Sequence, residues 1–381
     1  MQKPLPSDIS QLLGGLAPAQ FLTDYWHKKS LLIRRAIPDM APLLGKADLI
    51  RLSGRDEVES RLIARDGRRW KLEHGPFSAA RFRRMASLPW TLLVQGVNLH
   101  CAAADALLHR FDFIPLSRQD DLMISYAVDG GGVGPHFDSY DVFLLQAHGR
   151  RRWRVSTQGD RSLVSGAPLK MLSAFEPHEE HVLEPGDMLY LPPGCAHEGV
   201  ALGECMTYSI GFRAPSATEL ARGMLEHLAD TVQRDGFYAD PHLRPARQPA
   251  RLDDAYVRQA ARLIGRLTPT QAQIGTFLGC SLTEPKPNVF FEPPAPAVKP
   301  AQFARRAARS GIRLDLKTRM LHRGSTVFIN GESVRLPPAH AVLAQLADRR
   351  GLSPGAPVPD AAMALIYAWY THGWVHSGES S

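Results

Sequence analysis

Two histidines and one aspartate are the residues of this sequence best suited to bind a metal ion. His136 and Asp138 stand two positions apart, and on an extended segment their side chains point to the same face. His197 follows after an apolar stretch and a Pro-Pro-Gly bend, which would present it at the edge of a strand. Two histidines and a carboxylate on one side of a metal ion leave coordination positions open, as in non-haem Fe(II) oxygenases, whereas zinc with one water would form a closed tetrahedral site.

The two-residue spacing alone is weak support for a metal site, because one or two such pairs arise by chance in a chain with 15 histidines. A second pair, His178 with Glu180, lies in a polar stretch that we interpret as a solvated loop. Cys195 could be a soft ligand beside His197, although packing in the bend is the commoner role of such a cysteine. We therefore expect the metal site at the first pair and His197.

A run of arginines follows the metal motif. Arg150, Arg151 and Arg152 begin a segment with strand character, and alternation places Arg151 on the same face as Trp153. An oxygenase with this metal site needs a co-substrate that supplies electrons, and a guanidinium can hold the distal carboxylate of a 2-oxoacid with two hydrogen bonds. An exposed basic strand or a nucleic-acid patch would explain the same arginines, and these alternatives stay open.

The candidate ligands lie in a stretch of short strands separated by glycine and proline. Strands are expected at Leu122–Val128, Val142–Gln146, Arg152–Val155, His181–Leu183, Met188–Leu191 and Cys205–Phe212. A turn at Ala147–Gly149 would separate the second of these strands from the third. Short strands at this spacing are typical of an antiparallel sandwich or barrel.

The remainder of the chain is mainly helical. Ser216 and Glu219 form a capping-box pattern that predicts the start of one helix, and a second helix is expected at Ala255–Leu267. The proline-dense segment Glu284–Pro300 cannot form a regular helix, so we interpret it as a linker. Beyond it, Asn330-Gly331 predicts a β-hairpin flanked by helices, which is compatible with a winged-helix module.

Length and composition bound the class of protein. The chain has 381 residues, enough for two or three domains, and its 44% hydrophobic and 22% charged residues are ordinary for a globular protein. Four cysteines without a CxxC pair argue against a disulfide framework and favour a reduced, cytoplasmic protein. No apolar run reaches the roughly 18 residues of a membrane span, so no membrane partner is expected.

The charge is unevenly distributed. The whole chain carries +7, but the segment 112–213 contains 8 basic and 14 acidic residues, a net charge of −6. The two flanks therefore carry +13 together. We expect the acidic segment, which contains the metal motif, to meet a basic partner, whereas the basic flanks could contact RNA.

Five segments closely resemble the JmjC (cupin-like) ribosomal oxygenases, above all their bacterial arginine hydroxylases of large-subunit ribosomal protein sixteen. The segments are His136–Gln146, Gly149–Val155, Glu184–Gly194, His197–Gly199 and Tyr208–Pro215. The resemblance implies an α+β fold, in which a double-stranded β-helix (the JmjC or cupin jelly roll) precedes a helical dimerisation region and a winged-helix-like C-terminal domain. The corresponding boundaries are 1–213, 214–290 and 291–381.

The resemblance also implies roles for individual residues. The family's iron ligands match His136, Asp138 and His197. Its residues for the 2-oxoglutarate carboxylate match Arg151 and Ser125. Tyr140 and Asp141 lie beside the metal motif and are candidates for gripping a substrate arginine, with packing at the rim as the alternative for Tyr140.

The implied activity is that of an Fe(II)- and 2-oxoglutarate-dependent dioxygenase of the protein arginine 3-hydroxylase type, with O2 as the oxidant. Its substrate would be a large-subunit ribosomal protein, and the enzyme would be a cytoplasmic homodimer. The same chemistry on another residue, such as ribosomal histidine hydroxylation or lysyl demethylation, is a second hypothesis. A non-catalytic cupin protein associated with nucleic acid is a third, although a pure scaffold has no need of all three metal ligands.

Overall fold

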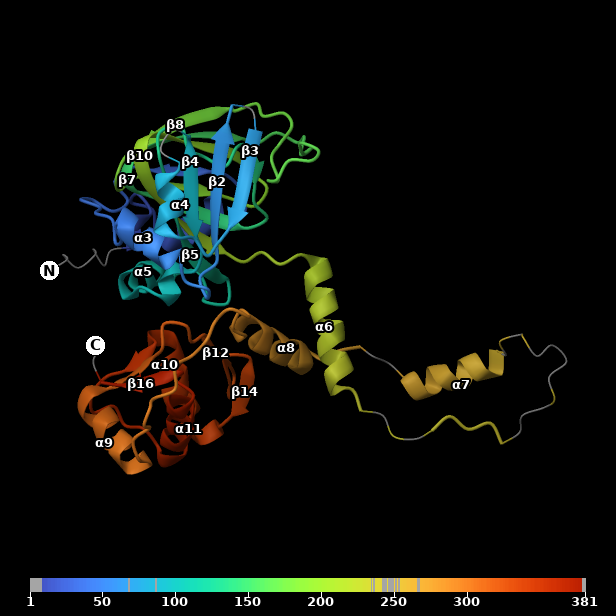
Figure 1. Ribbon diagram of the computed structural model, residues 1–381. Helices are drawn as coiled ribbons and strands as arrows, with labels where there is room; N and C mark the ends of the chain where they lie inside the picture. The colour runs from blue at the N-terminus through green and yellow to red at the C-terminus, as the bar shows by residue number, and fades with distance from the viewer. Residues whose placement is uncertain are drawn as a thin grey trace.

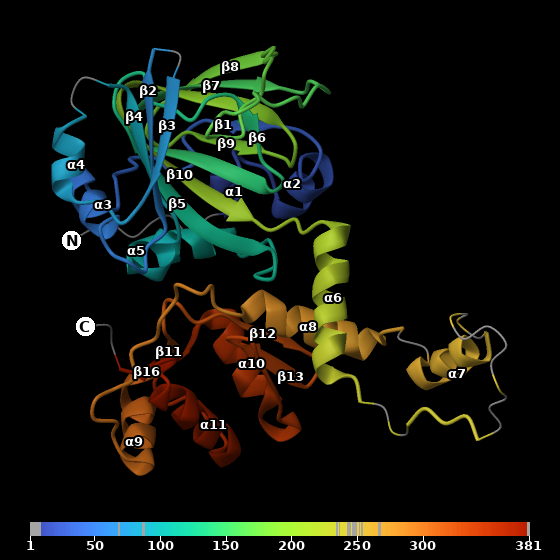
Figure 2. The same ribbon diagram turned by 45° about the vertical axis from the view of Figure 1, so that its right-hand side comes forward.

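The computed structural model contains a larger strand-rich body and a smaller body of helices and strands below it (Figure 1). It describes residues 9–378 apart from 68, 86–87, 234, 236, 242–244, 246–249, 251, 253 and 266–267. Helix α6 runs down from the larger body, and α7 projects away from both bodies in the two views (Figures 1 and 2). Within the described residues, no helix is long and apolar enough to cross a membrane.

The larger body is built on one sheet of ten antiparallel strands. The strand order is β1-β9-β7-β10-β5-β4-β2-β3, with β6 paired to β10 and β8 paired to β7. The strands are β1 Leu31–Ile33, β2 Ser60–Asp66, β3 Arg69–His74, β4 Trp90–Val94, β5 Gln119–Ala127, β6 His136–Phe137, β7 Asp141–Ser156, β8 Glu179–Leu183, β9 Met188–Leu191 and β10 Ala196–Phe212. The sheet curls into the jelly roll that the sequence predicts.

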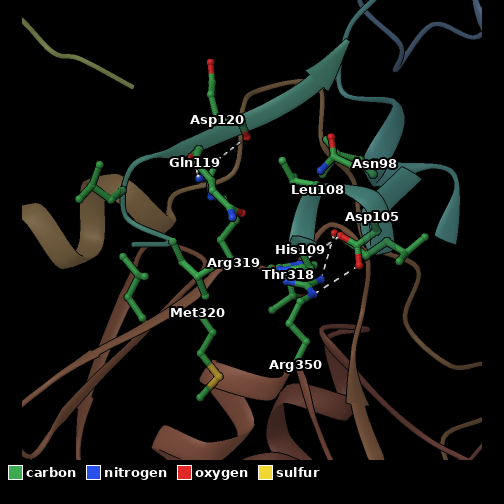
Figure 3. Close-up of a pocket in the computed structure, with 15 residues that line it drawn as sticks. Asn98, Asp105, Leu108, His109, Gln119, Asp120, Thr318, Arg319, Met320 and Arg350 are labelled. Carbon is green, nitrogen blue, oxygen red and sulfur yellow. Dashed lines mark hydrogen bonds and ion pairs between the residues drawn. The ribbon is translucent and has the colours of Figure 1, made fainter. Parts of the chain in front are cut away.

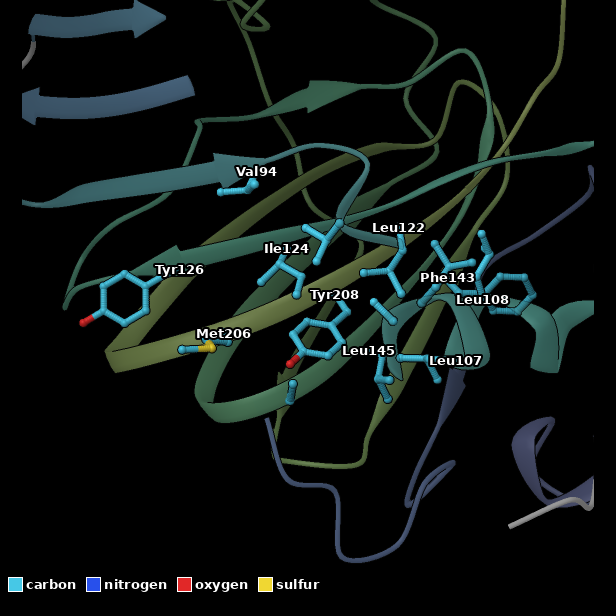
Figure 4. Packing of buried hydrophobic residues seen from close by; sticks show 14 of the residues in the cluster. Val94, Leu107, Leu108, Leu122, Ile124, Tyr126, Phe143, Leu145, Met206 and Tyr208 are labelled. Carbon is cyan, nitrogen blue, oxygen red and sulfur yellow. The ribbon is translucent and has the colours of Figure 1, made fainter. Parts of the chain in front are cut away.

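Short helices cover this sheet. They are α1 Ile9–Leu12, α2 Pro18–Asp24, α3 Lys46–Leu52, α4 Ala79–Arg83 and α5 Ala102–Leu108, with 3-10 turns at Val97–Leu99 and His109–Phe111. The strands send apolar side chains into one cluster beneath the helices (Figure 4). Leu122, Ile124, Phe143 and Tyr208 in this cluster are fully buried. Each large apolar side chain stabilises the fold by about 1.5–3 kcal/mol, which holds the strands that carry the site in register.

The predicted turn at Ala147–Gly149 is wrong, because β7 continues through it as one strand of 16 residues. Gly149 has a φ of +58°, and a Cβ there would lie 2.1 Å from the carbonyl oxygen of Glu204. The pairing register with β10 shifts between Leu202 and Met206, so this part of the ladder is bulged. A bulge and a turn both use glycine, which is why the sequence pattern did not separate them.

The helical region agrees with the predicted capping box. Helix α6 spans Ala217–Thr231; the Ser216 side chain accepts a hydrogen bond from the Glu219 N–H, and the Glu219 carboxylate accepts one from the Ser216 N–H. Helices α7 (Asp254–Ile264) and α8 (Gln271–Thr283) follow. The end of the predicted second helix, Leu267, lies outside the described residues.

The smaller body is a winged-helix arrangement around its own apolar core. Its elements are α9 Pro300–Ser310, β11 Ile312–Leu314, β12 Met320–Arg323, β13 Thr326–Ile329, β14 Glu332–Arg335, the 3-10 turn Pro337–Ala339, α10 His340–Arg349, β15 Gly351–Leu352, α11 Asp360–Thr371 and β16 Val375–Ser377. The predicted hairpin is confirmed: Asn330 and Gly331 both have positive φ, at 47° and 90°, between β13 and β14.

Candidate metal and co-substrate site

Antiparallel pairing between β6 and β10 brings together the two histidines that are far apart in the sequence. His136 stands directly opposite His197 in this ladder. Asp138 follows β6, and its Oδ2 lies 4.0 Å from His136 Nε2 and 3.8 Å from His197 Nε2. Ligand atoms of the three side chains lie within 4.8 Å of one another, so a single metal ion can contact all three.

Backbone carbonyls fix the orientation of both imidazole rings. His136 Nδ1 lies 2.9 Å from the Gly134 carbonyl oxygen, and His197 Nδ1 lies 3.0 Å from that of Cys195. Because a carbonyl only accepts, each Nδ1 carries the proton and each Nε2 presents a lone pair to the space beside Asp138. This is the tautomer that a metal-binding histidine needs.

The electrostatics of His197 also suit a ligand. Burial, together with the neighbouring His136, lowers the pKa of His197 to about 4. The imidazole is therefore neutral at neutral pH and available to a metal ion. Within the described part of the chain, no other group of three histidine, cysteine, aspartate or glutamate side chains is this close.

Cys195 lies near this group but takes no part in it. Its thiol is buried, with Sγ 3.7 Å from the carbonyl oxygen of Ser156. Burial raises the pKa of the thiol to about 11, which disfavours the thiolate that metals bind. The side chain packs in the bend before β10, as its position in the sequence suggests.

Arg151 and Ser125 meet inside the barrel from two different strands. Arg151 on β7 is 5% exposed, and its Nη1 donates to Ser125 Oγ on β5 over 3.4 Å. Its Nε and Nη2 find no hydrogen-bond partner among the described residues. An unpaired buried guanidinium is costly, and one that still offers donors fits an incoming carboxylate.

The alternation predicted for the arginine run is present. Arg151 and Trp153 are buried, with the Arg151 guanidinium carbon 5.7 Å from the indole centre, whereas Arg150 is exposed. Trp153 also lies 5.8 Å from the His197 ring, measured between centroids. The arginine face of β7 is therefore continuous with the candidate metal site.

Tyr140 lies at the rim of the barrel, with 37% of its surface exposed. Burial, and then the carboxylates of Asp138 and Asp121, raise the pKa of its hydroxyl. A Cβ at Gly211 would lie 3.8 Å from the Tyr140 ring and 3.9 Å from Asp121 Oδ1, so these three residues are neighbours. The rim thus combines an aromatic face with negative charge.

The structure does not bring Asp141 to this rim. Its side chain is fully buried, and its Oδ1 accepts a hydrogen bond from the Tyr190 hydroxyl at 2.6 Å. Its Oδ2 lies 3.1 Å from His27 Nε2. Successive residues on an extended chain face opposite sides, so the Asp141 side chain points into the protein interior and that of Tyr140 points outward.

Asp121 is a buried acidic neighbour of Tyr140 that the sequence reasoning missed. Its carboxyl is 7% exposed and accepts the Gly96 N–H at 2.8 Å. Burial, and then the charge of Asp120, raise its pKa to about 6. The available signal was an acidic residue two strand repeats before Ser125, on the face of the strand that Ser125 shares.

Three family models match the chain. A JmjC domain matches residues 106–220, a ROXA-like winged helix matches 264–376, and an AraC-like ligand binding domain overlaps them at 176–278. The ribosomal protein uL16 3-hydroxylase of Escherichia coli is 34% identical over 83% of this chain and 85% of its own length. A probable ribosomal oxygenase of Haemophilus influenzae is 34% identical over 61% of this chain and 63% of its own.

Solved structures give the same result over almost the whole chain. The X-ray structure of E. coli YcfD aligns with a TM-score of 0.83 at 32% identity, covering 95% of this chain and 98% of that one. YcfD in complex with cobalt and 2-oxoglutarate aligns with a TM-score of 0.81 at the same identity and coverage. The predicted fold and family are confirmed, and the chain belongs to the JmjC-domain ribosomal oxygenases.

Proposed function

We propose that this protein is an Fe(II)- and 2-oxoglutarate-dependent oxygenase that hydroxylates an arginine side chain of a large-subunit ribosomal protein. The observation that carries the proposal is the buried Arg151, two of whose donor groups have no partner among the described residues, on the barrel face that also holds the metal-ligand group. The name of the E. coli relative, a uL16 3-hydroxylase, supports the substrate class and the reaction type.

His136, Asp138 and His197 hold the iron. Two neutral imidazoles and one carboxylate are a ligand set that suits Fe(II), and they leave positions for other ligands. Iron bound there would activate O2 with 2-oxoglutarate as the electron donor, so that one oxygen atom of O2 would enter a carbon–hydrogen bond of the substrate and the other would leave in succinate, with release of CO2. The cobalt and 2-oxoglutarate complex of YcfD supports both groups.

Arg151 and Ser125 hold the distal carboxylate of 2-oxoglutarate. The free Nε and Nη2 of Arg151 can donate to its two oxygens, and Ser125 Oγ lies 3.4 Å from Arg151 Nη1. Both side chains are buried, so little water competes for these bonds and each is stronger than at a surface. The role of Arg151 is to bind and orient the co-substrate, not to react.

Tyr140 and Asp121 recognise the substrate arginine. A guanidinium can lie over the exposed Tyr140 ring and pair with the Asp121 carboxylate, its neighbour across Gly211. Asp138 adds negative charge but serves the metal. Asp141 supports this rim from within through Tyr190, without touching the substrate.

The exposed apolar residues of α6 and α7 favour a homodimer. No residue of α7 is buried. Leu225, Val232, Tyr256, Val257 and Ile264 are all between 42% and 63% exposed. A second copy of the chain would cover them, in keeping with the expected domains 1–213, 214–290 and 291–381. Sedimentation as a monomer at micromolar concentration would contradict this assembly.

The test of the proposed function is the mass of ribosomal proteins after incubation with the metal-loaded enzyme, 2-oxoglutarate and O2. We expect one protein of the large subunit to gain the mass of one oxygen atom, and fragmentation to locate it on an arginine. Such a substrate also implies a cytoplasmic enzyme. Loss of a methyl group from lysine, or an oxygen on histidine, would favour the second hypothesis; no change, with nucleic acid bound, would favour the third.

A further inference from the structure

Strand β5 begins with an irregular stretch, where its pairing within the ten-stranded sheet is interrupted. Its pairing with β10 passes from Leu122 opposite Ile210 to Gln119 opposite Phe212. Gly211 therefore faces two residues of β5, Asp120 and Asp121. A bulge of this kind leaves backbone groups outside the regular ladder, so their position depends on other partners.

A partner comes from the smaller body. Arg319 reaches across from the residue before β12 and donates through Nη2 to the Gln119 carbonyl at 2.5 Å and through Nη1 to the Asp120 carbonyl at 3.4 Å (Figure 3). Burial lowers the pKa of Arg319 to about 10, so the guanidinium is still protonated at neutral pH. A charged donor buried against two carbonyls is a strong anchor.

Arg319 is itself held in place by the predicted hairpin. Its backbone N–H donates to Asn330 Oδ1 at 3.0 Å, and the Asn330 N–H donates to the Arg319 carbonyl at 3.1 Å. The turn between β13 and β14 thus fixes the base of the arginine. Its side chain can transmit the position of the smaller body to β5.

The side chain of Asp120 joins two further segments at the same point. Its Oδ1 lies 3.3 Å from Arg213 Nε, after β10, and 3.8 Å from Lys286 Nζ in the linker. The next residue is Asp121, whose carboxyl borders Tyr140. Three segments from outside β5 therefore meet one residue before the acidic group of the substrate rim.

We propose that Arg319 is a positioning residue for the substrate, which acts by holding the β5 bulge so that Asp121 faces the incoming side chain. The inference rests on the proposed function, because it assigns the winged-helix body a role at the same site. It predicts that loss of Arg319 weakens substrate binding and leaves the metal and the co-substrate, which lie farther along the barrel, unaffected.

A second link between the bodies provides a matched control. Arg350 Nε lies 3.6 Å from Asp105 Oδ2, and His109 Nε2 lies 3.5 Å from Asp105 Oδ1 (Figure 3). Asp105 lies on α5, and among the described residues it is connected to β5 only indirectly, through His109 and Asp112 to the Gln119 side chain. Asp105→Asn weakens the contact between the bodies without releasing the bulge.

The experiment compares full-length wild type, Arg319→Met, Arg319→Lys and Asp105→Asn. We expect Arg319→Met to raise the KM for the ribosomal protein about tenfold, with kcat changed less than about twofold and the KM for 2-oxoglutarate unchanged. Arg319→Lys should restore part of the loss, because an ammonium can bond to one of the two carbonyls. Asp105→Asn should stay within about twofold of wild type.

Hydrogen exchange provides a readout that needs no substrate. Arg319→Met should increase deuterium uptake in the peptide that covers 116–122, and Asp105→Asn should not. If the wild type is active, and Arg319→Met and Asp105→Asn have the same KM for the ribosomal protein and the same deuterium uptake in the 116–122 peptide, the positioning role of Arg319 is overturned. A wild type that modifies no ribosomal protein contradicts the proposed function instead, and the exchange data then decide whether Arg319 holds the β5 bulge. If Arg319→Met does not fold, Arg319→Lys gives the decisive comparison.

Discussion

Three side chains in the barrel differ in charge, and each lies in a different part of its interior. His197 is neutral and directed at Asp138, Arg151 is a buried cation with free donors, and Asp121 is a buried acid at the rim. Each matches one reactant: a metal ion, a dicarboxylate and a cationic side chain. In the proposed function, this division of charge lets one barrel interior orient a metal ion, a co-substrate and a substrate side chain.

Replacing Arg151 with alanine tests the co-substrate assignment. The change removes the donors that bind the carboxylate, so we expect the KM for 2-oxoglutarate to rise at least about 100-fold, a loss of about 3 kcal/mol. Iron binding, followed by the visible spectrum of a metal-substituted sample, should persist. The exposed neighbour gives the control, Arg150→Ala. Undiminished turnover of Arg151→Ala would show that the carboxylate binds elsewhere.

The pH dependence of substrate binding tests Asp121. Its pKa of about 6 lies above the usual value because of burial, so the carboxylate is protonated as the pH falls below 6. A neutral carboxyl cannot pair with a guanidinium, and the KM for the substrate should then rise by up to about tenfold per pH unit. Asp121→Asn should show a high KM without this dependence. An unchanged wild-type KM between pH 5 and about 7 contradicts the role.

At the residue scale, the sequence identified those side chains whose spacing follows from strand geometry. His136, Asp138 and the face of Arg151 are examples, because alternation along one strand decides which way they point. Asp121 was missed because its place beside Tyr140 depends on pairing between β5, β7 and β10. Such a neighbour depends on tertiary pairing and leaves only a faint signal in a single sequence.

Secondary-structure elements hold the site through a few polar anchors. Asp141, the first residue of β7, is tied to Tyr190 on β9 and to His27 in the N-terminal segment. The Tyr190 hydroxyl also accepts the His27 N–H at 2.9 Å. These bonds connect the edge of the sheet with the chain that carries Tyr140, so that the rim is braced from inside.

Tyr190→Phe tests this anchor. The substitution removes two hydrogen bonds and leaves a buried carboxylate without its donor, so we expect a loss of about 2–4 kcal/mol in the free energy of unfolding. Thermal or urea unfolding measures the effect. Tyr256→Phe is the control and should be neutral, because it keeps the aromatic ring that a second copy of the chain would cover. A Tyr190→Phe variant as stable as wild type would mean that the anchor contributes little.

Elements with local signals were predictable and those that depend on pairing were less so. The capping box at Ser216 and the hairpin at Asn330-Gly331 are local chemistry, and both are present. The bulge at Gly149 was predicted as a turn, because a glycine with positive φ serves either structure. Only the partner strand β10 distinguishes them.

On the scale of the whole molecule, the charge is separated between parts. The segment 112–213 carries −6, and it includes the acidic rim, whereas the flanks carry the excess of basic residues. The proposed ribosomal substrate would be basic and therefore complementary to the rim, and charge of this kind raises the rate of association more than the affinity. The contact between the two bodies could not be predicted, since Arg319 and Arg350 act on residues some 200 positions away or more.

That contact should make stability depend on pH. Burial alone would lower the pKa of His109, but hydrogen bonds to Asp105 and Asp112 raise it to about 9. Because the folded protein holds the His109 proton more tightly than the unfolded chain, protonated His109 adds at most about 3 kcal/mol to the free energy of unfolding. This contribution is fully present below about pH 6.5 and is lost as the pH rises through 9. The melting temperature of wild type should therefore fall more steeply between these values than that of His109→Gln. Parallel curves for the two proteins would rule this contribution out.

The reaction that we propose for this protein is the transfer of an oxygen atom from O2 to an arginine of a ribosomal protein. The most direct measurement is tandem mass spectrometry of the ribosomal protein after reaction under isotopically heavy O2 with Fe(II), 2-oxoglutarate and enzyme. We expect one heavy oxygen on a single arginine side chain, absent without 2-oxoglutarate and absent with Asp138→Ala. An unmodified protein, an oxygen on another residue type, or an oxygen atom derived from water would contradict it.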